Sequence, residues 1–178
     1  QLDEQQPREQ AGFRRNFSVV DHLFTINQIL EKCNEYKLPL CIAFVDYERA
    51  FDSVEINAVL QALVDQGISS EYASLLKEAN SGRSTEITLF DRAVRIPLRR
   101  GVKQGDIISP KLFTACLEMV KRKIKWKGGI IIDGEKLNHL RFADDIVLFA
   151  SNSTELTQML RELENESKKV GITVNPQK

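Results

Sequence analysis

The sequence has few cysteines, no long apolar run and no net charge. Its cysteines, Cys33, Cys41 and Cys116, are odd in number and widely spaced, and none belongs to a CxxC pair. This pattern argues against a disulfide framework or a zinc site and fits a reducing intracellular compartment. No apolar run approaches the ~20 residues that a membrane span requires, and no signal peptide is visible.

The bulk composition is typical of one globular domain. Of the 178 residues, 42% are hydrophobic and 28% are charged, and the chain is long enough for a workable core. The sequence contains no internal repeat and no low-complexity segment. It begins at Gln1 rather than Met and stops at Lys178 directly after a motif-like segment, so we expect a piece of a longer protein.

The charges are unevenly distributed along the chain. Residues 99–127 include nine basic and two acidic residues, a local net charge of +7 that leaves −7 for the rest. A basic stripe beside an acidic cluster suits a polyanion held against metal ions. For residues 121–127, a solvated helix face is an equally good interpretation.

Two adjacent carboxylates, Asp144 and Asp145, lie between apolar runs that predict two strands, with the acidic pair as the tight turn that joins them. Like charges ~4 Å apart repel by roughly 4 kcal/mol at an effective dielectric constant near 20, and a bound divalent cation would remove that repulsion. A third carboxylate, Asp46, follows the apolar run over 40–45. Three carboxylates at strand ends favour a two-metal site for phosphoryl transfer. Taken alone, an Asp-Asp pair is more often a simple hairpin turn.

Periodicity, caps and turn residues predict an α+β fold. The first ten residues are polar and expected to be loose. Strand, helix, strand pair, helix and strand follow in the order of a split βαβ, ferredoxin-like sheet, on which Asp46 and the acidic pair would occupy adjacent strands. The predicted helices span about 18–36, 54–67, 69–81, 109–128 and 153–170, and the predicted strands span 40–45, 85–89, 94–98, 130–132, 137–142, 146–150 and 172–174.

Capping residues and apolar stripes locate the helix boundaries and faces. Ser18 followed by Asp21 is a capping-box pattern. Ser109, before Pro110, and Ser153 are predicted N-caps of two later helices. The apolar face of the first helix is predicted to be Leu23, Ile26, Leu30 and Cys33.

Five segments stand in a fixed order along the chain. They are Gln10-Ala11-Gly12-Phe13-Arg14, Phe44-Val45-Asp46-Tyr47-Glu48-Arg49-Ala50-Phe51-Asp52, the segment 100–113 that contains Gln104-Gly105 and Ser109-Pro110, Phe142-Ala143-Asp144-Asp145, and Gly171-Ile172-Thr173-Val174-Asn175-Pro176-Gln177-Lys178. They resemble the fingers segment and motifs A, B, C and D of reverse transcriptases. The resemblance covers about 10–178 and is closest to non-LTR retrotransposon enzymes of the RTE-like group, which commonly carry Phe at the position of Phe142.

The resemblance implies a reverse-transcriptase palm with part of the fingers, and a two-metal mechanism. Asp46 and Asp144 would hold two Mg²⁺ ions, with Mn²⁺ as a substitute. The backbone carbonyl of Tyr47 would assist, and Asp145 would support the site from its edge. One ion activates the primer 3′-hydroxyl, and the other steadies the triphosphate and the leaving pyrophosphate.

The resemblance also implies a nucleotide site. Phe51 would be the gate under the incoming sugar, where a ring would clash with a 2′-hydroxyl, although a core aromatic residue is the commoner interpretation of such a position. Gln104 and Gly105 would lie near the nucleotide; the alternative is an ordinary loop. Candidate contacts to nucleic acid or triphosphate are Arg14, Arg15, Lys103 and Lys178, with a solvent-facing pair as the alternative for the two arginines. His22 and His139 have no ligand-like spacing and are interpreted as structural.

The expected organisation is a partial fingers segment over 1–38 and a palm over 39–178, with an inserted helix and hairpin at about 69–98. The thumb, the upstream fingers and the endonuclease of the family are absent from this sequence. The implied partners are an RNA template, a DNA primer, deoxynucleoside triphosphates and the rest of a polyprotein, with no membrane. The implied location is intracellular, and nuclear during target-site integration.

The expected function is that of an RNA-directed DNA polymerase that adds deoxynucleotides to a DNA 3′ end. One alternative is a non-catalytic, nucleic-acid-binding scaffold derived from a reverse transcriptase; loss of the acids would mark it, and all three acids are present. Another is a different palm enzyme, such as an RNA-dependent RNA polymerase or a nucleotide cyclase. Those enzymes usually show Gly before the paired acids and lack Gln104-Gly105 followed by Ser109-Pro110.

Overall fold

The computed structural model describes residues 6–14, 16–82, 84–89, 92–98, 100–103 and 105–176. It confirms the predicted α+β class. The elements are α1 (Val19–Glu35), β1 (Cys41–Val45), α2 (Ala50–Ser53), α3 (Ile56–Asp65), α4 (Ser70–Asn80), β2 (Ser84–Leu89), β3 (Arg92–Pro97), α5 (Ser109–Lys123), β4 (Ile130–Ile132), β5 (Glu135–Leu137), β6 (His139–Phe142), β7 (Asp145–Ala150) and α6 (Ser153–Lys168).

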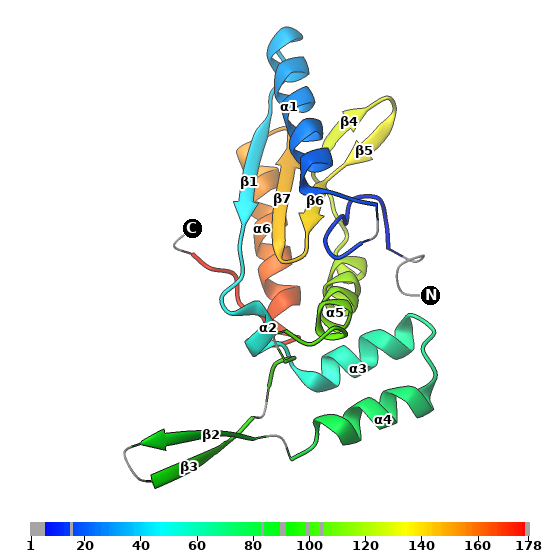
Figure 1. Cartoon of the computed structure of the whole chain (residues 1–178). Coiled ribbons are helices and arrows are strands. Elements are labelled where there is room, and N and C mark those ends of the chain that lie inside the picture. Colours follow the sequence, from blue (N-terminus) through cyan, green and yellow to red (C-terminus); the bar gives the residue numbers. More distant parts are fainter. Residues whose placement is uncertain are drawn as a thin grey trace.

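The central sheet is antiparallel, with the strand order β1-β7-β6 (Figure 1). A single antiparallel bridge joins Tyr47 to Val174 beyond the β1 edge, and a parallel bridge joins Gln10 to Arg141 beyond the β6 edge. The predicted last strand is therefore reduced to one bridge, but it lies beside β1, where the split βαβ topology places it.

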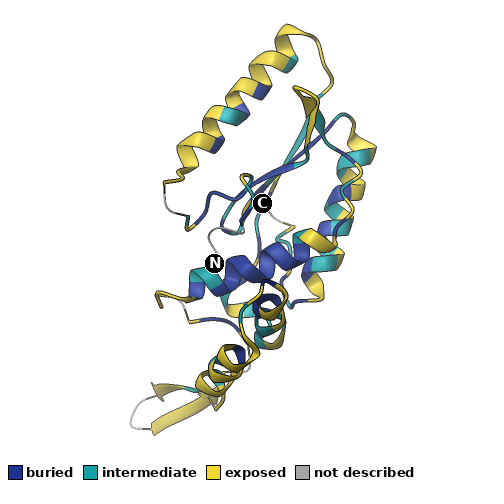
Figure 2. Ribbon diagram, turned by 90° about the vertical axis from the view of Figure 1, so that its right-hand side faces the viewer, coloured by how far each residue is buried: buried dark blue, intermediate teal, exposed yellow. Residues whose placement is uncertain are grey.

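Helices cover both faces of this sheet. On one face, Ile26 and Ile29 of α1 pack against Leu140 and Phe149. On the other face, α5 and α6 form the larger core together with α3. Figure 2 shows α5 buried along most of its length, whereas the outer side of α1 is exposed. Because α1 packs through Ile26 and Ile29, the predicted face was partly wrong: Leu23 and Leu30 point to solvent.

Three helix boundaries differ from prediction for local reasons. The N-cap of α6 is Asn152, whose Oδ1 accepts the Glu155 N–H at 2.9 Å, so Ser153 is already helical. In α5 the N-cap position is Ile108, and Ser109 is the first helical residue and is buried. That helix ends at Lys123, before the predicted glycines. The capping box of Ser18 and Asp21 is confirmed.

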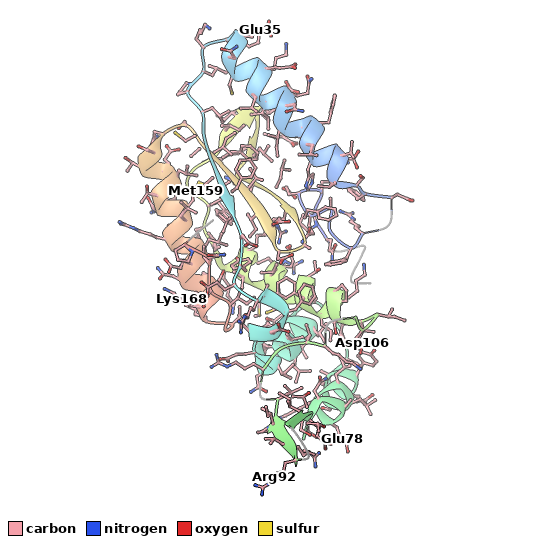
Figure 3. The ribbon with its side chains drawn as sticks, turned by 60° about the vertical axis from the view of Figure 1, so that its left-hand side comes forward. Glu35, Glu78, Arg92, Asp106, Met159 and Lys168 are labelled. Atoms are coloured by element: carbon pink, nitrogen blue, oxygen red, sulfur yellow. The ribbon has the colours of Figure 1, made fainter. Side chains whose placement is uncertain are left out.

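The predicted hairpin of β2 and β3 is present, but it does not join the main core. It projects from the body of the molecule (Figure 1), and Arg92 lies far from the core residue Met159 of α6 in Figure 3. Residues of β3 are exposed throughout. Within the described residues, no helix combines the length and the apolar character needed to cross a bilayer.

Candidate active site

The three predicted carboxylates lie at one end of the central sheet. Strand β1 ends at Val45, which pairs with Ile146 of β7. Extending this antiparallel register by one residue puts Asp46 opposite Asp145. Figure 1 shows that the turn between β6 and β7, which carries Asp144, lies at the same end of the sheet as the end of β1. The predicted placement of Asp46 and the acidic pair on adjacent strands is confirmed.

Alternation of side chains assigns Asp46 and Asp145 to the less covered face of the sheet. Val45 and Ile146 point into the core of α5 and α6, so their neighbours point to the opposite face. On that face α1 stops short of this end, and Phe44 is 70% exposed. The carboxylates therefore lie where a large ligand has access.

The turn itself is one residue earlier than predicted. Phe142 pairs with Asp145, so Ala143 and Asp144 form the two-residue turn and Asp145 begins β7. Of these two residues only Ala143 has positive φ, 60°, and a positive φ at the first central residue alone is characteristic of a type II′ hairpin turn. This geometry separates the two acids, since only Asp144 lies at the tip.

Tyr47 is held in place by the backbone hydrogen bonds of its two neighbours and by its own side chain. The Glu48 N–H donates to the Thr173 carbonyl, and the Asn175 N–H donates to the Asp46 carbonyl, each at 2.9 Å. Tyr47 and Val174 therefore form a non-hydrogen-bonded antiparallel pair. In such a pair the N–H and C=O groups of Tyr47 point away from Val174, toward the edge that carries β7. This direction suits the predicted use of the Tyr47 carbonyl.

The phenol of Tyr47 anchors the site to α6. Its hydroxyl lies 2.9 Å from Ser167 Oγ. Burial, partly offset by that hydrogen bond, raises the pKa of Tyr47 to about 12. The hydroxyl therefore stays protonated at neutral pH and acts as a structural group.

The oxygen donors at this end of the sheet suit Mg²⁺, which takes its remaining ligands from substrate and water. Carboxylate and carbonyl oxygens suit a hard cation, and Mg²⁺ is usually bound by one or two carboxylates together with substrate phosphates and water. In the described part of the chain, no three His, Cys, Asp or Glu side chains are close enough together to hold a metal ion by themselves. An open depression lined by Asp46, Tyr47, Glu48, Arg49 and Asn175 lies at the end of β1.

Phe51 packs between two other rings. It stacks on Phe113 of α5, with ring centroids 4.5 Å apart and an interplanar angle of 24°. Phe13 meets it edge-on at 6.2 Å and 87°. Phe51 is only half-buried, so part of the ring remains open to a ligand. This packing agrees with the interpretation as a core aromatic residue, and the role as sugar gate stays a prediction.

The segment predicted as motif B begins against α2. The Val102 N–H donates to the Phe51 carbonyl at 2.7 Å, and the Gly101 N–H donates to the Val54 carbonyl at 2.8 Å. Lys103 and Gly105 are exposed just beyond these bonds. Gln104 lies outside the described residues.

The other predicted contact residues fall into two groups. The Arg14 guanidinium donates to the Pro7 carbonyl at 2.8 Å and lies 4.1 Å above the Phe17 ring, so it is engaged within the chain. Arg15 and Lys178 lie outside the described residues. His139 is buried and stacks on Trp126, as a structural histidine does.

Sequence reasoning missed one residue beside the acidic turn. Gln10, placed in a segment expected to be loose, is fully buried, and its Oε1 accepts the backbone N–H of Ala143 at 3.2 Å. The expectation of loose residues is thus wrong from Gln6 onward, since Gln6 is buried too. The available signal was the position of Gln10 at the start of the fingers-like segment.

Comparison with known proteins supports the interpretation drawn from the geometry of the site. The family model described as reverse transcriptase (RNA-dependent DNA polymerase) matches residues 1–178. A Pol polyprotein of the type-1 retrotransposable element R2 from Nasonia vitripennis is 33% identical over 140 residues, which is 78% of this chain and 14% of that protein. An R2 polyprotein from Popillia japonica is 28% identical over 173 residues, 95% of this chain and 24% of that protein. The chain thus spans at most about a quarter of these two relatives.

Solved structures support the fold. Telomerase from Candida tropicalis, solved in complex with a TWJ fragment of telomeric RNA, aligns with a TM-score of 0.67 at 18% identity over 96% of this chain and 29% of that one. The apo form aligns with a TM-score of 0.58. The retrotransposon relatives confirm the resemblance to non-LTR enzymes. The chain belongs to the reverse transcriptase (RNA-dependent DNA polymerase) family.

Proposed function

We propose that this chain is the catalytic core of an RNA-directed DNA polymerase of a non-LTR retroelement. It adds deoxynucleotides to the 3′ end of a DNA primer along an RNA template. The observation that supports this function is the convergence of Asp46, the Tyr47 carbonyl and the turn carrying Asp144 at one accessible end of the sheet. Family membership supports the same activity.

The chain's own residues would bind and orient the reactants. Asp46, Asp144 and the Tyr47 carbonyl would hold two Mg²⁺ ions, with Asp145 at the edge. Bound there, the ions would lower the pKa of the primer hydroxyl and neutralise charge on the triphosphate. The ring of Phe51 would lie under the sugar, and Gln104 and Gly105 would lie near the nucleotide.

Several finer assignments complete this proposal. The motif pattern supports the RTE-like group, and a phylogenetic tree that includes R1, R2 and RTE sequences would test that placement. We assign residues 1–38 to the fingers and 39–178 to the palm, and expect a thumb and an endonuclease in the same polyprotein. Nuclear action at a target site follows from the same function.

The first experiment is primer extension on an RNA template by the complete protein that carries this chain. We expect Asp144→Asn to abolish Mg²⁺-dependent extension, because the amide removes a charged metal ligand. Asp133→Asn is the matched control, since Asp133 is also an aspartate in a two-residue hairpin turn, the one between β4 and β5. Extension by Asp144→Asn at the wild-type rate would exclude the two-metal assignment. Wild-type protein that binds template and primer but extends nothing would favour the scaffold alternative.

A further inference from the structure

The segment before α1 lies along the outer edge of β6 like a short additional strand. The Arg141 N–H donates to the Glu9 carbonyl at 2.7 Å, and the Ala11 N–H donates to the Arg141 carbonyl at 3.0 Å. These two bonds form the parallel bridge between Gln10 and Arg141. The segment is therefore fixed to the strand that leads into the acidic turn.

Within this segment, the side chain of Gln10 reaches the turn itself. Its Oε1 accepts two backbone N–H groups, that of Gly12 at 2.9 Å and that of Ala143 at 3.2 Å. Ala143 directly precedes Asp144 and has φ 60°. A left-handed residue other than Gly costs about 1–2 kcal/mol, so external contacts are needed to hold it. The Gln10 amide supplies such a contact.

Gly12 shows independently how close the segment approaches the turn. A Cβ on Gly12 would lie 2.0 Å from the Ala143 nitrogen and 2.7 Å from its Cα. No side chain fits that space, and the atoms in the way are backbone rather than the flexible end of a side chain. Gln10 and Gly12 therefore contact the same peptide, one by a hydrogen bond and one by close packing.

The same segment also contacts the nucleotide side of the site. Phe13 meets Phe51 edge-on, and the Phe13 carbonyl accepts a hydrogen bond from Lys111 Nζ at 2.5 Å. Over four residues, the chain thus links the turn that carries Asp144 to the ring proposed as the sugar gate. A segment that served only to cover the sheet edge would not need both contacts.

We propose that Gln10 is a positioning residue for the reaction: its Oε1 holds the Ala143–Asp144 turn in the orientation in which the Asp144 carboxylate meets the metal ions. This inference rests on the proposed polymerase function. Gln10 does not touch the reactants itself and acts through the Ala143 peptide.

The test compares Gln10→Met with Gln66→Met in the complete protein. Methionine keeps the length of the side chain and removes the amide. Gln66 is a matched control because it is also buried and also makes two hydrogen bonds to backbone, to the carbonyls of Ala62 and Ala115, but it joins α3 to α5 away from the turn. Both variants lose a comparable number of buried hydrogen bonds, so a purely structural effect would be similar in the two.

Three readouts separate positioning from stability. In Gln10→Met we expect the Ala143 amide to exchange with deuterium about five- to tenfold faster in the metal-free protein. We expect the Mg²⁺ concentration for half-maximal extension to rise, and kcat to fall by up to about 100-fold while KM for the deoxynucleotide changes little. Gln10→Glu, which retains the acceptor oxygen, is expected to keep wild-type exchange at Ala143.

The opposite results would overturn the proposal. Wild-type exchange at Ala143 in Gln10→Met would show that the side chain does not hold the turn. An equal rise in Mg²⁺ requirement in Gln66→Met would show that the effect is general destabilisation, and fast exchange in Gln10→Glu would show that the acceptor is not what matters. Exchange at Ala143 does not depend on catalysis, so an inactive wild-type protein would count against the proposed function and not against this contact.

Discussion

At the scale of single residues, the packing of Phe51 bears directly on its proposed role as the sugar gate. The stack on Phe113 and the edge contact with Phe13 fix the plane of its ring before any nucleotide arrives. If a sugar lay against it, a ring held in this way would resist displacement by an extra oxygen, whereas a loose ring would move aside.

We therefore expect Phe51→Val to admit ribonucleotides. Removing the ring opens space for a 2′-hydroxyl, and a pocket change of this size alters discrimination by roughly 10- to 100-fold. Competing deoxy- and ribonucleotides in primer extension measure the change. Phe24→Val, on the exposed side of α1, serves as the control. Unchanged sugar discrimination in Phe51→Val would refute the gate.

Sequence predicted the residues with an evident chemical pattern and missed those defined by a tertiary contact. The placement of Asp46 and the paired acids on adjacent strands followed from the order of apolar runs and turns. Gln10 has no such pattern, because it is a polar residue in a polar segment. Its role depends on a hydrogen bond to Ala143, which lies more than a hundred residues later in the sequence. The shift of the turn to Ala143 and Asp144 likewise depended on the β6–β7 register.

At the scale of elements, α5 and β6 are joined by a buried ion pair directly behind the site. The Arg141 Nη2 donates to Glu118 Oε2 at 2.7 Å, and both residues are almost fully buried. Lys121 and Arg122 also approach Glu118, at 3.7 and 3.1 Å. One carboxylate thus lies close to three cations, and its ion pair with Arg141 joins α5 to the strand that enters the acidic turn.

Glu118→Gln is expected to lower the free energy of unfolding by about 3–5 kcal/mol, because it leaves the Arg141 charge buried without its counter-ion. Urea denaturation of the variant measures the loss. The matched control is Glu164→Gln in the exposed pair with Lys168, for which a change of no more than about 1 kcal/mol is expected. Equal losses in the two variants would mean that the buried pair of Glu118 contributes no more to the free energy of unfolding than the exposed pair of Glu164 does.

The elements themselves were predicted better than their surroundings. Alternating residues correctly predicted the hairpin of β2 and β3, yet they could not show that it projects from the body with Ile87, Val94 and Ile96 partly exposed. An alternating pattern identifies the apolar face of a strand pair and leaves open what covers it. For the same reason the helical period of α1 did not fix which of its apolar residues meet the sheet.

For the molecule as a whole, the buried His139 makes stability depend on pH. Burial, together with the nearby charges of Arg141 and Lys121, lowers the pKa of His139 to about 2. In the unfolded chain the ordinary pKa is near 6.5, so below that pH the unfolded state binds a proton that the folded state does not. The free energy of unfolding is therefore fully retained above pH 6.5 and falls as the pH drops toward 2.

His139→Phe isolates this effect, since a phenyl ring can keep the stack on Trp126, whose centroid lies 5.0 Å away, and cannot be protonated. The linkage slope is about 1.4 kcal/mol per pH unit, so between pH 7 and pH 5 the wild-type protein should lose about 2 kcal/mol more than the variant does. Urea denaturation at both pH values gives this difference, and the buried His22, whose pKa burial also lowers, contributes equally to both proteins and cancels. Parallel losses in the two proteins would mean that His139 takes up its proton in the folded state, and that the space between α5 and β6 admits a charge.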